Sequence, residues 1–512
     1  MKICEYLSEN AKSLPEKEAV YCVPCQLRLT YRSLNQRVNC LCNMLLERGL
    51  KKGDRICVVS PNCHIHPELL MTAAKGGWIL TEIDHRLTSK EMEYIIKDSD
   101  PSIMFISEGL GDLLHPISQV FPSLKTIFLP NKYEEIVASH SDEEPKIQVQ
   151  GDDIITLMYT SGTTGRPKGV IYTHKNLVAA VANMATTLDI SVDDRTLHTS
   201  PFSHIAPIWP FLLHCYYGAS SIIIDDLDPT YILSTIEKER ISTWNTVPLL
   251  LGRVVDTTGK EKFDISSLRC ITYGASPIAL PVLKKALSFF GNILNQIYGC
   301  TEVYLLTFLG ASDHKLEGSE KEVKRLKSCG LPVINTETIV VGSDGKGIKS
   351  GEVGEVISRG DHVSPGYWRK PEETEQSMKE GWFFTGDLAT VDEGGFIFIT
   401  GRRKEIIITA GENVSPREVE DVLHGHQAVR EAVVVGLPHD QWGEAVTAFV
   451  ILREGEEVSE EALLAFCRER LAGYKRPKAA IFLEDFPRTT SGKILKRKLR
   501  DQYQNVVYQV KT

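Results

Sequence analysis

The sequence lacks any long apolar run. No uninterrupted stretch of about 18 apolar residues occurs, so we expect no membrane-spanning helix. The opening segment, Met-Lys-Ile-Cys-Glu-Tyr-Leu-Ser-Glu-Asn, has neither the apolar core nor the cleavage site of a signal peptide. Repeats and low-complexity tracts are also absent. We therefore expect a globular protein located in the cytoplasm.

The sequence also lacks a surplus of basic residues. Its 58 Lys and Arg stand against 67 Asp and Glu, which gives a formal net charge of −9. A protein devoted to nucleic acid needs a basic surface, so we expect no nucleic-acid partner. One basic run, which contains Lys496, Arg497, Lys498 and Arg500, is the only local signal for such a patch. A small phosphorylated ligand needs only a local positive site, so the net charge does not exclude a ligand of this kind.

Cysteine is not scarce. Of the 12 cysteines, seven lie between Cys4 and Cys63. Cys22-Val-Pro-Cys25 has the spacing of a zinc or redox motif, but Cys40-Asn-Cys42 has the wrong spacing for a second zinc pair. We therefore interpret these residues as reduced thiols of a cytosolic protein rather than as a metal site.

The length of 512 residues exceeds one compact core, so two or more domains are expected. The first part alternates helical and strand-like patterns, as α/β domains do. The pattern predicts helices over Leu34–Leu50 and His66–Gly77 and strands over Arg55–Ser60 and Gly77–Thr81. Two polar stretches, Glu134–Asp153 and Ala311–Ser328, have the composition of exposed linkers.

A different pattern begins near Gly401. Ser415, Pro416 and Glu418 predict a helix start with a capping box. Strands are expected at Ala432–Val435, Ala445–Ile451 and Ala479–Leu483, with a helix at Ser459–Leu471 between the last two. This αββαβ order is typical of a small α+β domain. We therefore expect a large domain over residues 1–400, a hinge at 401–404 and a small domain over 405–512.

A loop rich in Ser, Thr and Gly lies between two strand-like runs. The runs are Ile154–Tyr159 and Val170–Tyr172, and the loop spans Thr160–Gly169. Glycine permits the conformations that make backbone amides converge on an anion, and Lys168 adds a positive charge. The spacing is not that of a Walker A loop, which has Gly-Lys followed by Ser or Thr and opens a helix. The arrangement predicts a flap over phosphates between two strands.

The string Tyr159-Thr-Ser-Gly-Thr-Thr-Gly-Arg-Pro-Lys-Gly-Val170 resembles the signature of the adenylate-forming enzymes. That superfamily includes acyl-CoA synthetases, peptide-synthetase adenylation domains and firefly-type luciferases. Further segments resemble its other motifs in the same order: Pro201–His204, Tyr273–Pro277, Tyr298–Glu302, Gly351–Glu355, Thr385–Asp387, Gly401–Glu405, Gly443–Val446 and Pro487–Lys493. The resemblance runs from about residue 30 to the end of the chain. It implies a large N-terminal α/β domain and a small mobile C-terminal α+β domain.

The resemblance implies ATP, coenzyme A and a small carboxylic acid as substrates and Mg²⁺ as the cofactor. Glu302 would bind Mg²⁺, and Thr301 would contact the α-phosphate. Asp387 would accept hydrogen bonds from the ribose hydroxyls. Lys493 would bridge the carboxylate and phosphate oxygens, and with Glu302, Thr301 and Lys168 it forms the catalytic set. The ATP- and AMP-binding residues would be Thr160, Ser161, Gly162, Thr163, Thr164, Gly165, Lys168, Gly274, Ala275, Ser276, Tyr298, Gly299, Thr301, Asp387 and Arg402.

The resemblance also implies movement of the small domain. Lys404 matches the hinge position. After the acid is activated, the small domain would rotate so that Lys493 leaves and the segment with Gly411 and Glu412 approaches. Gly411 would let the narrow pantetheine arm of coenzyme A pass close to the backbone.

The acid is less well defined. The resemblance implies these residues of the acyl pocket: His204, Ile205, Ile208, Trp209, Asn245, Val247, Gly274, Tyr298 and Leu305. Most of these residues are apolar and none is charged like Asp, Lys or Arg, which favours a fatty or aromatic acid. Trp209 and Trp244 are either pocket walls or core residues.

Several alternatives to an acyl-CoA ligase stay open. The same fold serves enzymes that load a separate carrier protein and luciferase-like oxygenases. A binding protein without catalysis is disfavoured because Lys168, Glu302, Asp387 and Lys493 are all present. The chain is either a monomer or a homodimer.

Overall fold

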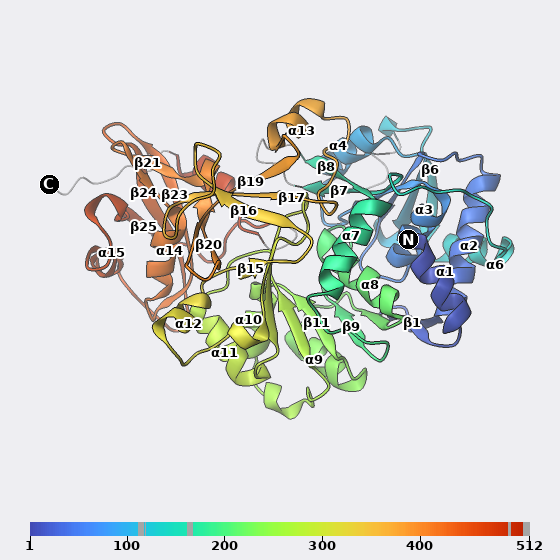
Figure 1. Ribbon diagram of the computed structural model, residues 1–512, viewed down its shortest axis with the longest axis horizontal. Helices are drawn as coiled ribbons and strands as arrows, with labels where there is room; N and C mark the ends of the chain where they lie inside the picture. Colours follow the sequence, from blue (N-terminus) through green and yellow to red (C-terminus); the bar gives the residue numbers. More distant parts are fainter. Residues whose placement is uncertain (111–116, 118, 161–166, 490–492, 505–512) are drawn as a thin grey trace. The chain divides into compact units, whose positions relative to one another are not determined.

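The computed structural model describes residues 1–512 except 111–116, 118, 161–166, 490–492 and 505–512 (Figure 1). The chain forms two compact units. The first consists of Met1–Thr338 and Ser358–Phe383, and the second of Ile339–Ile357 and Phe384–Thr512. The second unit thus includes segments that the sequence analysis assigned to residues 1–400, while a hinge at 401–404 stays a prediction. In the described part of the chain, no helix combines the length and the apolar character needed to cross a membrane.

The first unit contains a six-stranded sheet with the strand order β6-β5-β3-β4-β7-β8. All neighbouring strands are parallel except β7 and β8. The strands are β3 (Arg55–Val59), β4 (Ile79–Ile83), β5 (Ile103–Ser107), β6 (Lys125–Leu129), β7 (Ile154–Thr160) and β8 (Lys168–Thr173). The helices of this region are α1 (Ile3–Ser13), α2 (Tyr31–Glu47), α3 (Ile65–Gly76), α4 (Ser89–Ser99), α6 (Asn131–Ser139) and α7 (His174–Ala185), with a 3₁₀ turn η1 (Glu108–Leu110).

A nine-stranded sheet forms the rest of the first unit, in the order β15-β14-β13-β12-β11-β9-β10-β1-β2. Its strands are β1 (Glu18–Cys22), β2 (Leu27–Thr30), β9 (Arg195–His198), β10 (Ser220–Ile223), β11 (Thr243–Thr246), β12 (Cys270–Tyr273), β13 (Leu294–Tyr298), β14 (Thr307–Leu309) and β15 (Leu331–Pro332). The helical segments are α8 (Ile205–Tyr217), α9 (Pro229–Lys238), α10 (Pro248–Asp256), η2 (Lys260–Lys262), α11 (Leu280–Phe290), η3 (Ala311–Asp313) and α12 (Glu320–Arg325). Helices α1, α7 and α8 contact one another, and their apolar side chains share one large core with both sheets.

A further sheet has five strands, and the boundaries between the two units fall within some of these strands. Its order is β16-β17-β19-β18, and β20 pairs with β19. The elements are β16 (Glu337–Val341), β17 (Gly354–Arg359), α13 (Pro371–Ser377), β18 (Met378–Lys379), β19 (Trp382–Val391) and β20 (Ile397–Arg402). Strand β20 ends at Arg402, directly before the 3₁₀ turn η4 (Arg403–Glu405) that contains the predicted hinge residue Lys404.

The remaining sheet of the second unit has the order β22-β21-β24-β23, with β25 paired to β24. Its elements are β21 (Ile407–Thr409), β22 (Glu412–Val414), α14 (Pro416–His424), β23 (Val429–His439), β24 (Gly443–Leu452), α15 (Glu460–Arg468), η5 (Gly473–Lys475), β25 (Ala479–Phe482) and α16 (Lys496–Tyr503). The predicted αββαβ order is confirmed by α14, β23, β24, α15 and β25. The α/β class of the large part and the α+β class of the small part are confirmed with it.

Three local predictions were wrong. The prediction of a linker over Glu134–Asp153 was wrong only for its first residues, because helix α6 extends to Ser139 and buries Tyr133 and Ile136, whereas residues 140–153 form neither helix nor strand. The stretch Ala311–Ser328 contains η3 and α12, the latter capped by Ser319. Helix α14 begins at Pro416 as predicted, but it has no capping box.

Ser415 and Glu418 form no capping box because each of them has another partner. The Ser415 hydroxyl donates to the carbonyl oxygen of Thr400 instead of capping the helix. The Glu418 carboxylate accepts a hydrogen bond from Lys475 Nζ at 2.7 Å. Tertiary partners have therefore replaced the local ones.

A buried carboxylate ties together the loops at one end of the nine-stranded sheet. Asp194 accepts hydrogen bonds from Ser191 N at 2.7 Å, Ser242 Oγ at 2.6 Å and Arg269 Nε at 2.9 Å. Burial alone would raise the pKa of Asp194, but the hydrogen bonds from Arg269 and Ser242 outweigh it and lower the pKa. Because the folded pKa lies below the unfolded one, the carboxylate stabilises the fold at every pH above about 4, the usual Asp pKa.

We predict that Asp194→Asn lowers the free energy of unfolding of the first unit by roughly 1–2 kcal/mol at pH 7, because a charged acceptor is lost. Urea unfolding followed by tryptophan fluorescence reports on this unit, since it contains five of the six tryptophans: Trp78, Trp209, Trp244, Trp368 and Trp382. The difference between variant and wild type should shrink as the pH falls below about 4, where the unfolded Asp is protonated. Equal urea midpoints at pH 7 would contradict this role of Asp194.

Candidate active site

The predicted phosphate loop connects two antiparallel strands. Thr160 pairs with Lys168, and Tyr159 pairs with Gly169, in the β7–β8 hairpin. The predicted strand–loop–strand arrangement is therefore confirmed. The binding residues predicted within the loop itself, Ser161, Gly162, Thr163, Thr164 and Gly165, lie outside the described residues.

A second segment holds the outer edge of this hairpin. Trp368 N donates to the Gly169 carbonyl at 2.8 Å, and Ile171 N donates to the Gly366 carbonyl at 3.0 Å. The Ser364 hydroxyl donates to the Ile171 carbonyl at 2.8 Å. Strand β8 therefore has a hydrogen-bonded neighbour on both edges, and its start at Lys168 has a defined position.

The same segment fixes the turn that contains Thr301 and Glu302. Ser364 N donates to the Glu302 carbonyl at 2.8 Å, and the Tyr367 hydroxyl donates to Glu302 Oε1 at 2.7 Å. From the hairpin side, the Tyr172 hydroxyl donates to the Thr301 carbonyl. Burial, reinforced by the negative charge of Glu302, raises the pKa of Tyr367, so its hydroxyl keeps its proton and stays a donor.

Lys168 joins this group through the ring of Tyr367. Its Nζ lies 4.9 Å from the ring centroid, which is the range of a cation–π interaction. The hairpin lysine and the Glu302 carboxylate thus both contact Tyr367, and the adjacent Thr301 carbonyl is held by Tyr172. The structure therefore brings together three of the four predicted catalytic residues: Lys168, Thr301 and Glu302.

The predicted adenine-side residues follow two adjacent parallel strands. Gly274 follows β12 and Gly299 follows β13, so both lie at the same edge of the sheet. A Cβ at Gly274 would lie 2.4 Å from the Ile297 carbonyl oxygen, and one at Gly299 would lie 1.9 Å from that of Tyr304. Only glycine fits at these two positions, because in each case the obstacle is backbone. Ala275 and Ser276 are exposed in the same loop, and Tyr298 is the last residue of β13.

The predicted ribose-binding residues lie in the second unit. Asp387 is 5% exposed and forms an ion pair with Arg402, whose Nε lies 2.9 Å from Asp387 Oδ1. The two residues also face each other in the β19–β20 register. Next to them, Glu355 accepts a hydrogen bond from Gly386 N at 3.0 Å and forms an ion pair with Arg403. The motif Thr385–Asp387 is therefore held in place by two ion pairs, Asp387–Arg402 and Glu355–Arg403.

Lys493 closes a short loop of the second unit. Its backbone N donates to Thr489 Oγ1 at 3.0 Å, and Thr489 N donates to the Lys493 carbonyl at 2.7 Å. The side chain is exposed. Arg488 and Ile494 form an antiparallel bridge beside it.

The predicted coenzyme A segment is a tight turn. Ala410 and Gly411, which connect β21 and β22, have φ angles of +50° and +83°. Two successive left-handed residues are typical of a type I′ hairpin turn. Gly411 and Glu412 are exposed, and a Cβ on Gly411 would meet no heavy atom within 4 Å. Gly411 is therefore required by the turn rather than by any packing within the chain.

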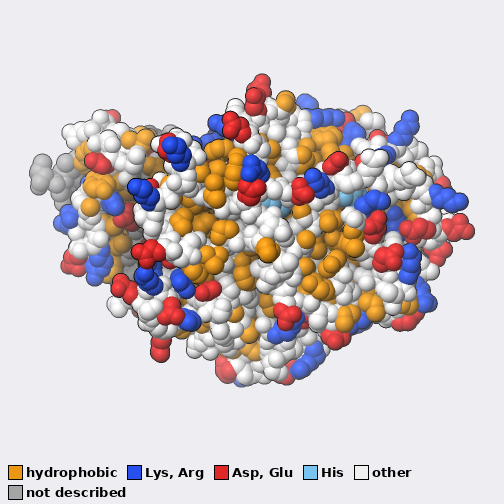
Figure 2. Space-filling view, in the orientation of Figure 1, with side chains coloured by type: hydrophobic (Ala, Val, Ile, Leu, Met, Phe, Trp, Pro, Cys, Tyr) orange, Lys and Arg blue, Asp and Glu red, His pale blue; other side chains and the backbone are white. Residues whose placement is uncertain are grey.

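The C-terminal basic run is engaged within its own unit. Lys496 Nζ lies 2.9 Å from Glu420 and 3.2 Å from Glu405, and Arg500 lies 3.2 Å from Glu444. On the face seen in Figure 2, acidic and basic side chains are interspersed. Two of the four basic residues of this run, Lys496 and Arg500, therefore form ion pairs within the fold.

The predicted acyl-pocket residues cluster around the start of α8 and the end of β11. Ile208, Trp209, Asn245 and Leu305 are buried, and His204, Ile205 and Val247 are partly exposed. Trp209, Trp244 and Asn245 line a cavity of about 10 Å³ together with Leu188, Ile190, Thr196, Pro210, His214, Thr243, Cys270 and Thr272. That volume suits one water molecule and not an acyl chain. Trp244 donates to Thr199 Oγ1 at 3.1 Å and is a core residue.

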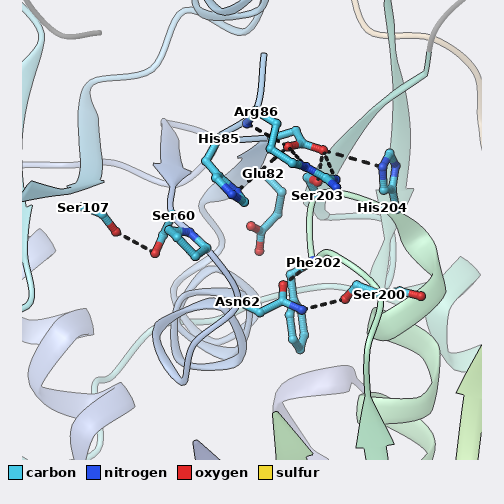
Figure 3. A network of polar contacts seen from close by, with 12 residues as sticks. Ser60, Asn62, Glu82, His85, Arg86, Ser107, Ser200, Phe202, Ser203 and His204 are labelled. Carbon is cyan, nitrogen blue, oxygen red and sulfur yellow. Dashed lines mark hydrogen bonds and ion pairs between the residues drawn. The ribbon is translucent and has the colours of Figure 1, made fainter. Parts of the chain in front are cut away.

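Asp84, directly after β4, contacts the end of the motif Pro201–His204. Arg86 approaches its carboxylate at 2.7 Å and 2.9 Å, and the Ser203 hydroxyl donates to it at 3.3 Å. His204 Nε2 lies 3.8 Å from Asp84 Oδ2. Figure 3 shows the three side chains, Arg86, Ser203 and His204, converging on the carboxylate.

The other side of the same loop is held by Asn62. Its amide donates to the Ser200 carbonyl at 2.9 Å, and its side-chain oxygen accepts from Phe202 N at 3.2 Å (Figure 3). The motif Pro201–His204 is thus fixed between the ends of β3 and β4. An acyl group bound beside this motif, as predicted, would contact a loop whose position is fixed by these hydrogen bonds.

Sequence reasoning missed four residues that support the site: Asp84, Tyr172, Glu355 and Tyr367. Glu355 closes a motif that the resemblance singled out, so its position was an available signal. Tyr172 and Tyr367 have partners that are distant in the sequence, Thr301 and Glu302, and Asp84 contacts the distant residues Ser203 and His204 besides its neighbour Arg86. No local pattern indicates such pairs.

Comparisons with known proteins identify the family. The sequence profile described as AMP-binding enzyme matches residues 7–368, and that of the AMP-binding enzyme C-terminal domain matches residues 418–493. A long-chain-fatty-acid–CoA ligase, FadD13 of Mycobacterium tuberculosis, is 32% identical over 504 residues, 98% of each chain. A feruloyl-CoA synthase of Amycolatopsis is 33% identical over 93% of this chain and 94% of its own length.

A solved structure agrees with these relatives. ATP-bound MatB from Rhodopseudomonas palustris superimposes with a TM-score of 0.89 at 27% identity, covering 99% of this chain and 100% of that one. Both the order of the motifs and the fold therefore match over nearly the whole length. The chain belongs to the AMP-binding enzymes, the adenylate-forming superfamily that includes the acid–CoA ligases.

Proposed function

We propose that this enzyme activates an apolar carboxylic acid with ATP, releases pyrophosphate, and passes the acyl group from the acyl-adenylate to coenzyme A. The observation that carries the proposal is the anchoring of both Lys168 and Glu302 by the segment Ser364–Trp368, next to Thr301, whose carbonyl is held by Tyr172. A carboxylate that attacks the α-phosphate of ATP brings two anions together. The site must therefore neutralise charge and hold the attacking oxygen in line.

The donor set fits Mg²⁺. Among the described residues, no three His, Cys, Asp or Glu side chains gather into a metal cage. Mg²⁺ does not need such a cage, because it binds one or two carboxylates together with phosphate oxygens and water. The Glu302 carboxylate, oriented by Tyr367, is the ligand that this chain offers. When bound, the ion would neutralise phosphate charge during transfer.

The second unit supplies the other contacts of this proposal. Asp387 accepts hydrogen bonds from the ribose hydroxyls, and Arg402, its ion-pair partner, adds a positive charge beside them. Lys493 bridges the developing anions of carboxylate and α-phosphate during acid activation. No general base is needed, because a carboxylic acid is already ionised at neutral pH.

The two half-reactions use different segments of the second unit. Lys493 serves the first, and the Ala410–Gly411 turn serves the second by admitting the pantetheine arm of coenzyme A. We infer that the small domain rotates about Lys404 between them, which is a lid-type mechanism. The exposure of both Lys493 and Gly411 supports the inference, since each is accessible to a ligand.

The acid is proposed to be fatty or aromatic. Ile205, Ile208, Val247 and Leu305 give the predicted pocket an apolar lining, and the named substrates of the two relatives are likewise a fatty acid and an aromatic acid. The Asp84 carboxylate near His204 is paired with Arg86, so it does not by itself favour an ammonium-bearing substrate.

The direct test of the function is pyrophosphate release with a panel of fatty and aromatic acids, with and without coenzyme A. We expect release that depends on the acid, and formation of AMP and a thioester only when coenzyme A is added. No acid-dependent release from any member would refute the activation step. Acyl-adenylate without thioester would refute transfer to coenzyme A and point to a carrier protein or an oxygenase.

We predict that Lys493→Ala slows acyl-adenylate formation by about 10²–10³-fold, because a positive group at the transition state is lost. Thioester formation from supplied acyl-adenylate should stay within about twofold of wild type. Lys498→Ala, an exposed lysine on α16 of the same unit, is the matched control and should leave both steps unchanged. Equal loss of both half-reactions in Lys493→Ala would rule out the proposal that Lys493 and the Ala410–Gly411 turn serve different half-reactions.

We predict that Tyr367→Phe raises the Mg²⁺ concentration needed for half-maximal activity by about tenfold, because the hydroxyl that orients Glu302 is lost. Activity would be titrated with Mg²⁺ at saturating ATP. Tyr217→Phe removes a hydroxyl that donates to the Ala185 carbonyl at 3.4 Å and should not change the titration. An unchanged Mg²⁺ requirement in Tyr367→Phe would show that Glu302 is not the ligand or is positioned by other groups.

A further inference from the structure

The turn between β13 and β14 contains a tyrosine with an unusual backbone conformation. Tyr304 has a φ angle of +70°, a left-handed conformation that is costly for a residue with a bulky side chain. Hydrogen bonds of the turn enforce it, because Tyr304 N donates to the Cys300 carbonyl at 2.7 Å. Two residues further, Leu306 N donates to the Tyr298 carbonyl at 2.9 Å. Glycine would fit this position without strain, so the turn itself does not explain the tyrosine.

The ring of Tyr304 lies against the predicted acyl pocket. It contacts the ring of Trp209 edge to face, with 6.3 Å between the ring centroids and 86° between the ring planes. Leu305, the next residue in the chain, is also a predicted pocket residue, and all three side chains belong to the same apolar core. Tyr304 is 9% exposed and Trp209 is 4% exposed. The two rings therefore fill space that a long acyl chain beside these residues would need.

The hydroxyl of Tyr304 does not account for the side chain. It is buried, and it has no hydrogen-bond partner among the described residues. A buried hydroxyl without a partner costs free energy instead of stabilising the fold. What Tyr304 contributes at this position is therefore the volume of its ring.

The space beyond Trp209 is small and partly polar. The cavity lined by Trp209 and Asn245 has a volume of about 10 Å³, which suits one water molecule. Polar side chains of its lining are paired with each other: Asn245 Nδ2 donates to Thr272 Oγ1 at 2.9 Å, and His214 Nε2 lies 2.9 Å from Thr243 Oγ1. An alkyl chain that passed Trp209 would separate these partners and leave buried polar groups unpaired. This cavity therefore does not lengthen the pocket for a long chain.

We propose that Tyr304 and Trp209 limit the length of the acyl group, so that the acid activated by this enzyme is a short-chain aliphatic acid of the size of propionate or butyrate. The inference rests on the proposed function and narrows its substrate class. Octanoate, palmitate and benzoate would overlap with the two rings. In a packed apolar pocket, a difference of one methylene group changes kcat/KM by about 10–200-fold, so the discrimination is expected to be strong.

The first test needs no variant. Acid-dependent pyrophosphate release by the wild-type enzyme would be measured with straight-chain acids from acetate to palmitate and with benzoate. We expect kcat/KM to be highest for propionate or butyrate and at least about 100-fold lower for octanoate and benzoate. A kcat/KM for octanoate or benzoate equal to that for butyrate would overturn the inference and leave acid activation intact. Release with none of the acids would refute the proposed function and the inference with it.

Two substitutions at Tyr304 separate the volume of the ring from its hydroxyl. Tyr304→Gly removes the ring and also relieves the left-handed backbone, which partly offsets the lost packing and favours a folded variant. The ratio of kcat/KM for octanoate to that for butyrate should rise at least about tenfold, because space for the longer chain opens. Tyr304→Phe keeps the ring and loses only the unpartnered hydroxyl, so this ratio should stay at its wild-type value. An unchanged ratio in folded Tyr304→Gly, or a raised one in Tyr304→Phe, would contradict the role of ring volume.

Trp209→Leu tests the other ring independently and decides the question if Tyr304→Gly does not fold. Leucine is apolar and favours helix, so α8 should persist. The same ratio of octanoate to butyrate should again rise at least about tenfold. Trp78→Leu is the matched control, because Trp78 is fully buried in the same unit but precedes β4, whereas Asp84 follows that strand. It should keep the wild-type ratio. No rise in Trp209→Leu, or an equal rise in Trp78→Leu, would overturn the inference.

Discussion

The short segment Ser364–Trp368 is the constraint on which the candidate site depends. It pairs with the outer edge of β8 through Gly366 and Trp368, and it holds Glu302 through Ser364 N and the Tyr367 hydroxyl. The hairpin and the Thr301–Glu302 turn lie in different sheets, so neither sheet alone sets their spacing. Because the segment binds both, a lysine from one sheet and a carboxylate from the other lie beside the same tyrosine, Tyr367.

The same principle recurs around the other candidate residues. In the second unit, Asp387 and Glu355 are each neutralised by an arginine, Arg402 and Arg403. At the proposed acyl entrance, the Pro201–His204 loop is fixed by Asn62 and by the carboxylate that also binds Arg86. A nucleotide-transfer site needs charges in defined places before its substrates arrive, since groups that are already oriented need no reorganisation during reaction. The ion pairs of Asp387 and Glu355 and the hydrogen bonds of the Pro201–His204 loop fix these groups in this way.

Much of the fold and part of the site could be predicted from the sequence. Apolar runs such as Arg55–Ser60 predicted strands, because a buried parallel strand must be apolar on both faces. The motifs placed Lys168, Thr301, Glu302, Asp387 and Lys493 because their spacing is read directly from the chain. The capping box at Ser415 failed because the hydroxyl found a tertiary acceptor, and Tyr367 was missed because its partner lies 65 residues away.

We propose that the carboxylate attacks the α-phosphate, so that the reaction is nucleotidyl transfer rather than phosphoryl transfer. Heavy-oxygen labelling of the acid's carboxylate tests it most directly. One labelled oxygen should be found in the AMP after complete turnover, because the bridging oxygen of the acyl-adenylate stays with the nucleotide when the thiol attacks. Label in pyrophosphate or inorganic phosphate, with none in the nucleotide, would contradict the account.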